Sequence, residues 1–333
     1  MRTPLVHLVG SVPLADSEAV FRTATDLLGR RLRRLPDGET GERVHWIAWQ
    51  RAVFGAHPSL EVDRDGRYHP RADVDPATVR FDDLGYARAA GESWVVFDRL
   101  QHEGVIPDDV RFQVSVPTPL APVVAFVAPD AQGDLETPYL DALHRELDKI
   151  FELVPSDRLA IQWDVRPEMW MWEGWVPAPF DDVGAGVVER LVRLGADVPD
   201  GVELGYHLCY GGWKDPPDAA AAVAVANALA AVLPRPVQWF HLPVPRSRTD
   251  DAYFAPLAAL ALRPGTEVYL GLVHLTDGVD GTEARIATAR RHLPRFGVAT
   301  ECGFGRRPPD TIVDLLQVHA VVAPALDGSQ PAP

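Results

Sequence analysis

The stretch VELGYHLCY, residues 202–210, decides the fold prediction because its apolar residues run almost without a break. A strand with one face in water alternates polar and apolar residues, whereas a nearly continuous apolar run is typical of a strand covered on both faces. Strands of this kind build parallel sheets that are covered by helices. Short strand candidates recur at seven other places: residues 5–11, 33–39, 110–116, 159–165, 237–244, 268–275 and 298–305.

Helical patterns separate these strand candidates. Residues 16–32 begin with a capping Asp16 and an acidic first turn, and they end in arginines that suit the negative end of a helix. Residues 138–154 repeat apolar residues at helical spacing, and residues 216–233 are rich in alanine. Eight strands alternating with helices predict an α/β fold, a single (β/α)8 TIM barrel over residues 1–325. A doubly wound open sheet is the alternative, although no GxGxxG motif follows the first strand and no GxxxxGK[ST] motif occurs.

Two segments fall outside the alternating pattern. Residues 56–90 are polar and rich in turn residues, so they predict a long insertion after strand 2 that could fold over the mouth of the barrel. The tail, residues 326–333, is expected to be disordered.

Composition restricts the classes of partner. The 333 residues are 47% hydrophobic and 24% charged, which fits a soluble globular protein with a large core. A formal net charge of −15 argues against nucleic acid or an anionic membrane as the partner, because both attract clustered positive charge. No apolar run approaches the ~20 residues that span a bilayer, and the first residues lack the apolar segment of a signal peptide. Two cysteines cannot form a disulfide framework, so we expect a cytoplasmic protein.

Polar residues gather at the predicted strand ends, where TIM barrels carry their active sites. They are Ser11, Asp37, Glu39, Gln162, Asp164, His207, Cys209, His241, His274, Glu301 and Cys302. His207 and Cys209 share one face of a strand because they are two residues apart, and Cys302 ends the eighth strand. Zinc accepts this mixture of nitrogen and sulfur ligands. Free cysteines are more often small core residues, but the second cysteine and His241 favour a metal site over that alternative.

Five motifs resemble the catalytic barrel of cobalamin-independent methionine synthase, a family in the superfamily that includes uroporphyrinogen decarboxylase. They are VGSVP (9–13), PDGETGERVHWIAWQ (36–50), IQWDVRPE (161–168), YHLCYGG (206–212) and TECGFGRR (300–307). In this order they are similar to the family's Gly-Ser-aromatic-Pro opening, its His-Gly-Glu-Pro-Glu-Arg segment, Ile-Gln-x-Asp-Glu-Pro-Ala, His-x-Cys-Tyr and Pro-Asp-Cys-Gly-Leu-Lys-Thr-Arg. Asp37 stands in place of the histidine of the second motif. Five motifs in one order, over nearly the whole chain, are fairly specific for the fold and superfamily.

The resemblance implies a set of metal ligands. The family's zinc ligands fall on His207, Cys209 and Cys302, and His241 stands where the family has a glutamate ligand. His241 is therefore expected to be the fourth ligand or, alternatively, a packed histidine at a strand end.

The resemblance also implies substrate-binding residues. The family holds its amino-acid substrate through residues that correspond to Ser11, Glu39 and Asp164, and Gln162 lies in the same motif as Asp164. Two converging carboxylates suit a substrate ammonium group. The alternative is structural: Ser11 would cap a helix, and the carboxylates would pair with nearby arginines, namely Arg34, Arg43 and Arg166.

Departures from the family pattern change some expectations. Thr276 replaces a histidine linked to catalysis, so His274 is expected to take over acid–base work beside Glu39 and Asp164 as catalytic residues. Tryptophans cluster after Asp164, and they are expected to form an aromatic wall for the substrate or simply to pack a loop. They are Trp170, Trp172 and Trp175. Family members use a second barrel to help hold folate, and one barrel here makes folate use unexpected.

The resemblance implies a zinc-dependent alkyl or methyl transfer to the sulfur of a small, homocysteine-like thiol. Zinc would supply a thiolate at neutral pH, because a coordinated thiol is deprotonated. A zinc-dependent lyase or hydrolase is the alternative, since an imidazole in place of the glutamate ligand would make the site more positive. A metal-free barrel that binds a small molecule is the third hypothesis.

Overall fold

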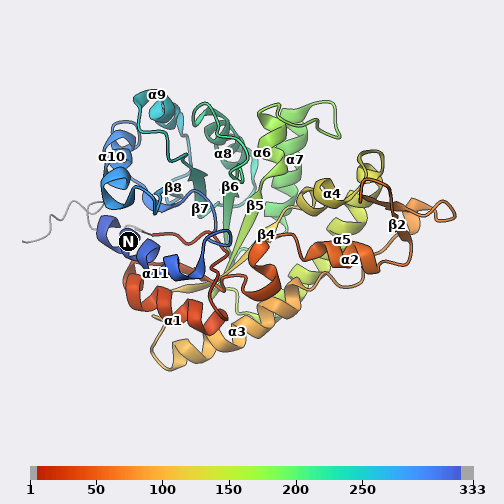
Figure 1. Ribbon diagram of the computed structural model, residues 1–333, viewed down its shortest axis with the longest axis horizontal. Coiled ribbons are helices and arrows are strands. Elements are labelled where there is room, and N and C mark those ends of the chain that lie inside the picture. Colours follow the sequence, from red (N-terminus) through yellow and green to blue (C-terminus); the bar gives the residue numbers. More distant parts are fainter. Residues whose placement is uncertain (1–5, 324–333) are drawn as a thin grey trace, which may run out of the picture.

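The computed structural model describes residues 6–323, and the predicted tail at 326–333 lies outside them. A curled parallel sheet of seven strands occupies the centre, with helices around it (Figure 1). In sheet order the strands are β1 (Arg34–Pro36), β4 (Arg111–Pro117), β5 (Leu159–Val165), β6 (Glu203–Leu208), β7 (Trp239–Pro243), β8 (Glu267–Val273) and β9 (Gly297–Thr300). The predicted α/β fold is confirmed in a form consistent with a TIM-like barrel.

Helices connect successive strands and cover the outer face of the sheet (Figure 1). They are α1 (Ser17–Leu28), α2 (Gln50–Ala56), α3 (Tyr86–His102), α4 (Leu120–Phe126), α5 (Gln132–Leu153), α6 (Pro167–Trp172), α7 (Val183–Ala196), α8 (Ala220–Val232), α9 (Asp251–Phe254), α10 (Gly278–Arg290) and α11 (Ile312–Val322). Asp16 caps α1 as predicted, because its side chain accepts from the backbone N–H of Ala19 at 2.8 Å. Among residues 6–323, no helix has both the length and the apolar character to cross a bilayer.

The strand predicted at residues 5–11 is reduced to one residue in the described segment 6–11. Val6 forms isolated parallel bridges with Leu32 and with Val298, so it lies between the two ends of the sheet. After Val6, side chains form hydrogen bonds with the backbone carbonyls that would otherwise pair with a neighbouring strand. The Gln113 amide donates to the carbonyls of Leu8 and Val9, at 3.1 and 3.2 Å. Side-chain hydrogen bonds therefore replace regular pairing here.

Residues 56–90, the segment expected to be an insertion, lie between β1 and β4 in the chain. They contain the end of α2, an antiparallel hairpin of β2 (Leu60–Val62) and β3 (Tyr68–Pro70), and the start of α3. The hairpin is tied to α4, since the Arg67 guanidinium donates to the carbonyls of Val124 and Ala125 at 2.8 and 2.5 Å. This places the hairpin at the side of the molecule, beside α4 (Figure 1).

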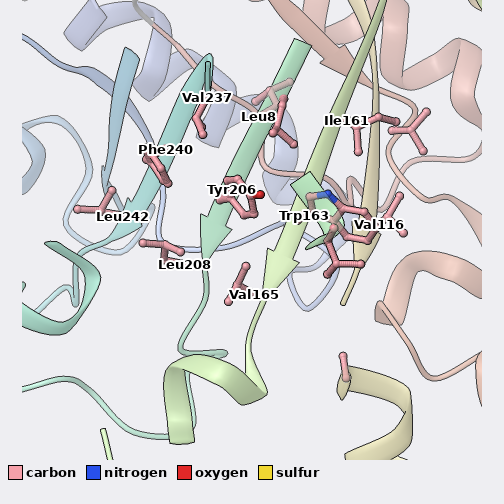
Figure 2. Close-up of a cluster of buried hydrophobic side chains, with 14 of the residues drawn as sticks. Leu8, Val116, Ile161, Trp163, Val165, Tyr206, Leu208, Val237, Phe240 and Leu242 are labelled. Atoms are coloured by element: carbon pink, nitrogen blue, oxygen red, sulfur yellow. The ribbon is translucent and has the colours of Figure 1, made fainter. Parts of the chain in front are cut away.

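Side-chain alternation gives the sheet two different faces. On β6, Tyr206 and Leu208 join the large apolar core between strands and helices, as do Trp163 and Phe240 of neighbouring strands (Figure 2). Because successive side chains point to opposite faces, His207 lies on the inner face.

The inner face is mainly polar, and an arginine spans it. Arg34 of β1 donates to Glu203 of β6 at 2.5 Å and to Glu267 of β8 at 2.8 Å. Its guanidinium also lies 4.1 Å from the centre of the Trp239 ring. These partners belong to strands that are not neighbours of β1 in the sheet. Only a strongly curled sheet brings them within reach of one side chain.

Gly205 on β6 leaves room for the Trp239 indole, because a Cβ at position 205 would lie 2.0 Å from that ring. We expect Gly205→Ala to lower the free energy of unfolding by about 1–3 kcal/mol through overpacking. Gly133→Ala is the matched control, since a Cβ at this exposed position of α5 meets nothing within 4 Å, and it should stabilise by about 0.5 kcal/mol. Urea unfolding measures both variants, and equal stability of the two would contradict the expected clash.

Candidate functional site

A cavity of about 330 Å³ opens at the carboxyl ends of the strands. Asp164 near the end of β5 is in register with His207 of β6, and His207 is in register with His241 of β7. Six residues expected from the sequence line this cavity: Ser11, Glu39, Asp164, His207, Cys209 and Cys302. The structure therefore brings together residues that lie up to 291 positions apart (11 to 302) in the chain.

Three of these residues form a group that could hold a metal ion. The ligand atoms of His207, Cys209 and Cys302 all lie within 4.8 Å of one another, and the two sulfurs are 3.7 Å apart. Both cysteines are free thiols. Within residues 6–323, no other group of histidine, cysteine or acidic side chains meets this spacing.

The two sulfurs share a hydrogen bond that differentiates them. This contact raises the pKa of Cys209 well above its usual value and holds the pKa of Cys302 well below it. Cys302 is therefore the thiolate of the pair and Cys209 the donor. A thiolate is the form that binds a metal ion, so one of the two sulfurs is already prepared to do so.

A chain of hydrogen bonds behind His207 fixes which ring nitrogen carries a proton. The carbonyl of Thr300 can only accept, so His241 donates to it from Nε2 over 2.9 Å. Burial lowers the pKa of His241 well below its usual value, so this ring is neutral and its Nδ1 accepts. His207 Nδ1, 2.6 Å away, is then the donor, which leaves the lone pair of His207 on Nε2.

The free nitrogen of His207 is the observation that best fits a metal. Nε2 is buried and has no hydrogen-bond partner, although buried polar atoms are nearly always paired. One imidazole nitrogen and two sulfurs form a donor set typical of zinc. His241, the expected fourth ligand, does not join the group because Thr300 and His207 occupy its two nitrogens. It contacts His207 on the side away from the cysteines and fixes the tautomer of that ring instead.

Two carboxyl groups face the same cavity. Ser11 donates to Glu39, and the backbone N–H of Glu39 donates to Asp37 at 2.9 Å. Burial raises the pKa of Glu39 to about 7, and burial together with the nearby Glu39 raises the pKa of Asp164 well above its usual value. A bound cation would be held by both groups and would favour their charged forms.

The three arginines expected as alternative partners of these carboxyls make other contacts. Arg43 pairs with Asp37 at 2.7 Å, and Arg34 pairs with the two glutamates on the inner face of the sheet. Arg166 stacks on two tryptophan rings. The ion-pair alternative for Glu39 and Asp164 therefore has no support in the described contacts.

Backbone strain is concentrated at the cavity. Within residues 6–323, Glu39 and Trp46 are the two non-glycine residues with positive φ, at 47° and 60°. Both line the cavity. Strained residues of this kind persist only where the surrounding structure holds them, and they cluster at functional sites.

Other residues expected at the site lie around it and do not line the cavity. Gln162 is fully buried and donates to Asp164 at 2.9 Å, so it orients that carboxyl. His274 contacts the Val244 carbonyl at 3.0 Å and Glu301 at 3.3 Å, and burial lowers its pKa to about 4.

The predicted tryptophans also lie outside the cavity lining. Trp170 donates to the carbonyl of Tyr210 at 3.0 Å and packs on Arg166. Trp172 packs against the apolar core. Among the cavity residues that were not expected from the sequence, Trp46 and Arg306 each lie inside a motif that was identified. Their position within those motifs was the sequence signal that could have identified them as cavity residues.

Comparison with known proteins gives structural neighbours only. No protein-family model and no curated protein matches the chain. The fold is similar to a protein from Listeria monocytogenes assigned as a vitamin-B12-independent methionine synthase, with 16% identity and a TM-score of 0.54 over 95% of this chain and 87% of that one. A B12-independent methionine synthase from Shewanella sp. W3-18-1, solved with selenomethionine, has 13% identity and a TM-score of 0.61 over 98% and 97%. A methyltransferase from Methanosarcina mazei has 12% identity and a TM-score of 0.60 over 96% and 94%. The chain shares its fold with these proteins.

The hydrogen-bond chain through His241 predicts an effect on metal affinity. His241→Leu should weaken zinc binding about 10–100-fold, because His207 loses the acceptor that fixes its tautomer. His241→Gln should keep most of the affinity, since an amide can accept from His207 and donate to Thr300. Competition with a chromogenic chelator under reducing conditions measures the zinc affinity of each variant. Wild-type affinity in the leucine variant, or equal losses in both variants, would contradict the role of His241.

Proposed function

We propose that this protein is a zinc-dependent enzyme that transfers a methyl or other alkyl group to the sulfur of a small thiol amino acid or a similar thiol. His207, Cys209 and Cys302 would hold the zinc. The observation that carries the proposal is the convergence of one free imidazole nitrogen and two sulfurs within 4.8 Å, in a cavity that also contains two carboxyl groups. The fold shared with methionine synthase-like and methyltransferase proteins supports it.

The metal would supply acidity: zinc bound by these residues would keep a substrate thiol deprotonated at neutral pH. The other tasks belong to side chains of the chain itself. Glu39 and Asp164 bind the substrate ammonium, and Ser11 holds Glu39 in place through its hydroxyl. A cavity of about 330 Å³ fits a small metabolite and orients its sulfur.

Residues behind the cavity would position those that line it. Gln162 orients Asp164, and His274 contacts Glu301, which precedes Cys302 in the chain. No observation favours the alternative of a lyase or hydrolase. That alternative rested on the changed seventh strand, where Thr276 replaces a histidine, and on His241 as an imidazole ligand, and both ring nitrogens of His241 already have partners.

We also infer that residues 6–9 stand in the place of an eighth strand and complete a (β/α)8 barrel. The two parallel bridges of Val6, one to each end of the sheet, support this arrangement. The hydrogen bond from His7 N–H to the Val298 carbonyl at 3.0 Å extends the contact with β9 by one residue.

Metal analysis tests the ligand set. Wild-type protein purified with zinc should carry about one zinc per chain, and Cys209→Ser or Cys302→Ser should reduce this below about one-tenth, because each removes a thiolate ligand. His102→Gln is the control, since this histidine lies exposed on α3. Zinc below about one-tenth in the wild type, or full occupancy in Cys209→Ser, would refute the site.

Sulfur coordination tests the substrate class. Zinc-edge X-ray absorption of the zinc-loaded protein should show one additional sulfur ligand when homocysteine is supplied. Methionine sulfoxide, which has no free thiol, should leave the spectrum of the zinc-loaded protein unchanged. Product analysis with a methyl donor should then show S-methylation. No added sulfur with any of a panel of small thiols would contradict the proposed activity.

A further inference from the structure

Two arginines at the cavity have no acidic partner. Arg166 follows β5 directly, and Arg306 lies in the loop after β9; both line the cavity. Among the described residues, neither forms an ion pair, whereas neighbouring Arg43 pairs with Asp37 and Arg307 pairs with Glu301. The half-buried Arg166 guanidinium has no carboxylate partner, and the charges near it that stabilise its protonated form are the sulfurs of Cys209 and Cys302.

The guanidinium of Arg166 is held in a defined position. Its Cζ lies 4.9 Å from the centre of the Trp46 ring and 4.4 Å from that of Trp170. Gly211 makes room for it, because a Cβ at position 211 would lie 2.3 Å from Arg166 Nε. That Nε is buried and has no hydrogen-bond partner. The side chain is therefore fixed by stacking while part of its hydrogen-bonding capacity stays unused.

Arg306 adds a second positive charge beside the first. It lies over Gly212, the neighbour of Gly211, where a Cβ would be 3.4 Å from Arg306 Nη2. Burial lowers the pKa of Arg166, the two cysteine sulfurs oppose this, and the charge of Arg306 lowers the pKa further. Two positive charges that line one cavity and repel each other favour binding of an anion.

We propose that Arg166 and Arg306 form an anion subsite that binds an acidic group, a carboxylate or a sulfonate, on the thiol substrate. This inference rests on the proposed function and specifies its substrate class. Zinc with two cysteine thiolates has no net charge, so the arginines are the unmatched positive charges of the cavity. A zwitterionic thiol amino acid matches all three parts: sulfur toward the metal, ammonium toward Glu39 and Asp164, and carboxylate toward the arginines.

A matched pair of ligands tests the subsite by calorimetry. Homocysteine and homocysteine amide differ only in the acidic group, and zinc-loaded protein should bind the acid about 10–100-fold more tightly. Arg306→Gln should reduce this preference to about threefold or less, and so should Arg166→Gln. Arg306 is exposed, so its replacement leaves the core intact. Arg64→Gln is the control with the same change of net charge, on an exposed loop of the hairpin, and should keep the full preference.

A second pair separates this inference from the proposed function. Methionine and methioninamide have no free thiol, so their binding to zinc-free protein reports on the subsite alone, and the acid should again bind more tightly. If the zinc-edge spectrum shows no added sulfur but this preference persists and falls in Arg306→Gln, the subsite stands and the proposed activity fails. If homocysteine coordinates but acid and amide bind equally, the subsite is wrong and the activity stands.

The nature of the acidic group is resolved with thiols of similar size. 3-Mercaptopropionate and 2-mercaptoethanesulfonate are compared with neutral 3-mercaptopropanol on the zinc-loaded protein. Tighter binding of either anion supports the subsite, and the tighter of the two identifies the acidic group. Equal binding of the neutral alcohol overturns the subsite.

Discussion

The structure depends on one constraint: strands covered on both faces must place every polar side chain of their inner face against a partner, because water is largely excluded there. Side chains alternate along each strand, so residues two apart share that inner face. At one end of the sheet, Arg34 satisfies the constraint with two glutamates and an indole ring. At the other end, His207 leaves one nitrogen unsatisfied. Of the residues that line the candidate site, His207 thus keeps a buried atom free to bind a ligand.

Seven of the strands were predictable because apolar runs between helical patterns specify buried parallel strands. The exception is instructive. Residues 6–11 have the composition of a strand, but the carbonyls of Leu8 and Val9 accept hydrogen bonds from the Gln113 side chain. That competition comes from a residue more than a hundred positions away, so no local pattern reveals it. Residues 56–90 were recognised as irregular, yet their docking beside α4 depends on Arg67, whose partners are likewise distant.

Much of the candidate site was also predictable, because strand ends and family-like motifs pointed to Ser11, Glu39, Asp164 and the His-Cys-Cys group. The roles of the residues behind them were not. Whether His241 faces the metal group or supports His207 depends on the Thr300 carbonyl, which lies on a different strand. The unpaired state of two arginines was equally hidden: a sequence shows that arginines are present, and only the fold shows which of them lack an acidic partner.

The Arg34 cluster has a consequence for the route that molecules take. Arg34 is 3% exposed, and with Trp239 it fills the interior of the curled sheet beneath the cavity. These two side chains close the interior on that side, so a molecule reaches the cavity from the carboxyl ends of the strands. In the proposed transfer, the alkyl donor and the thiol acceptor would then both approach from this side, and the first product would leave on the same side.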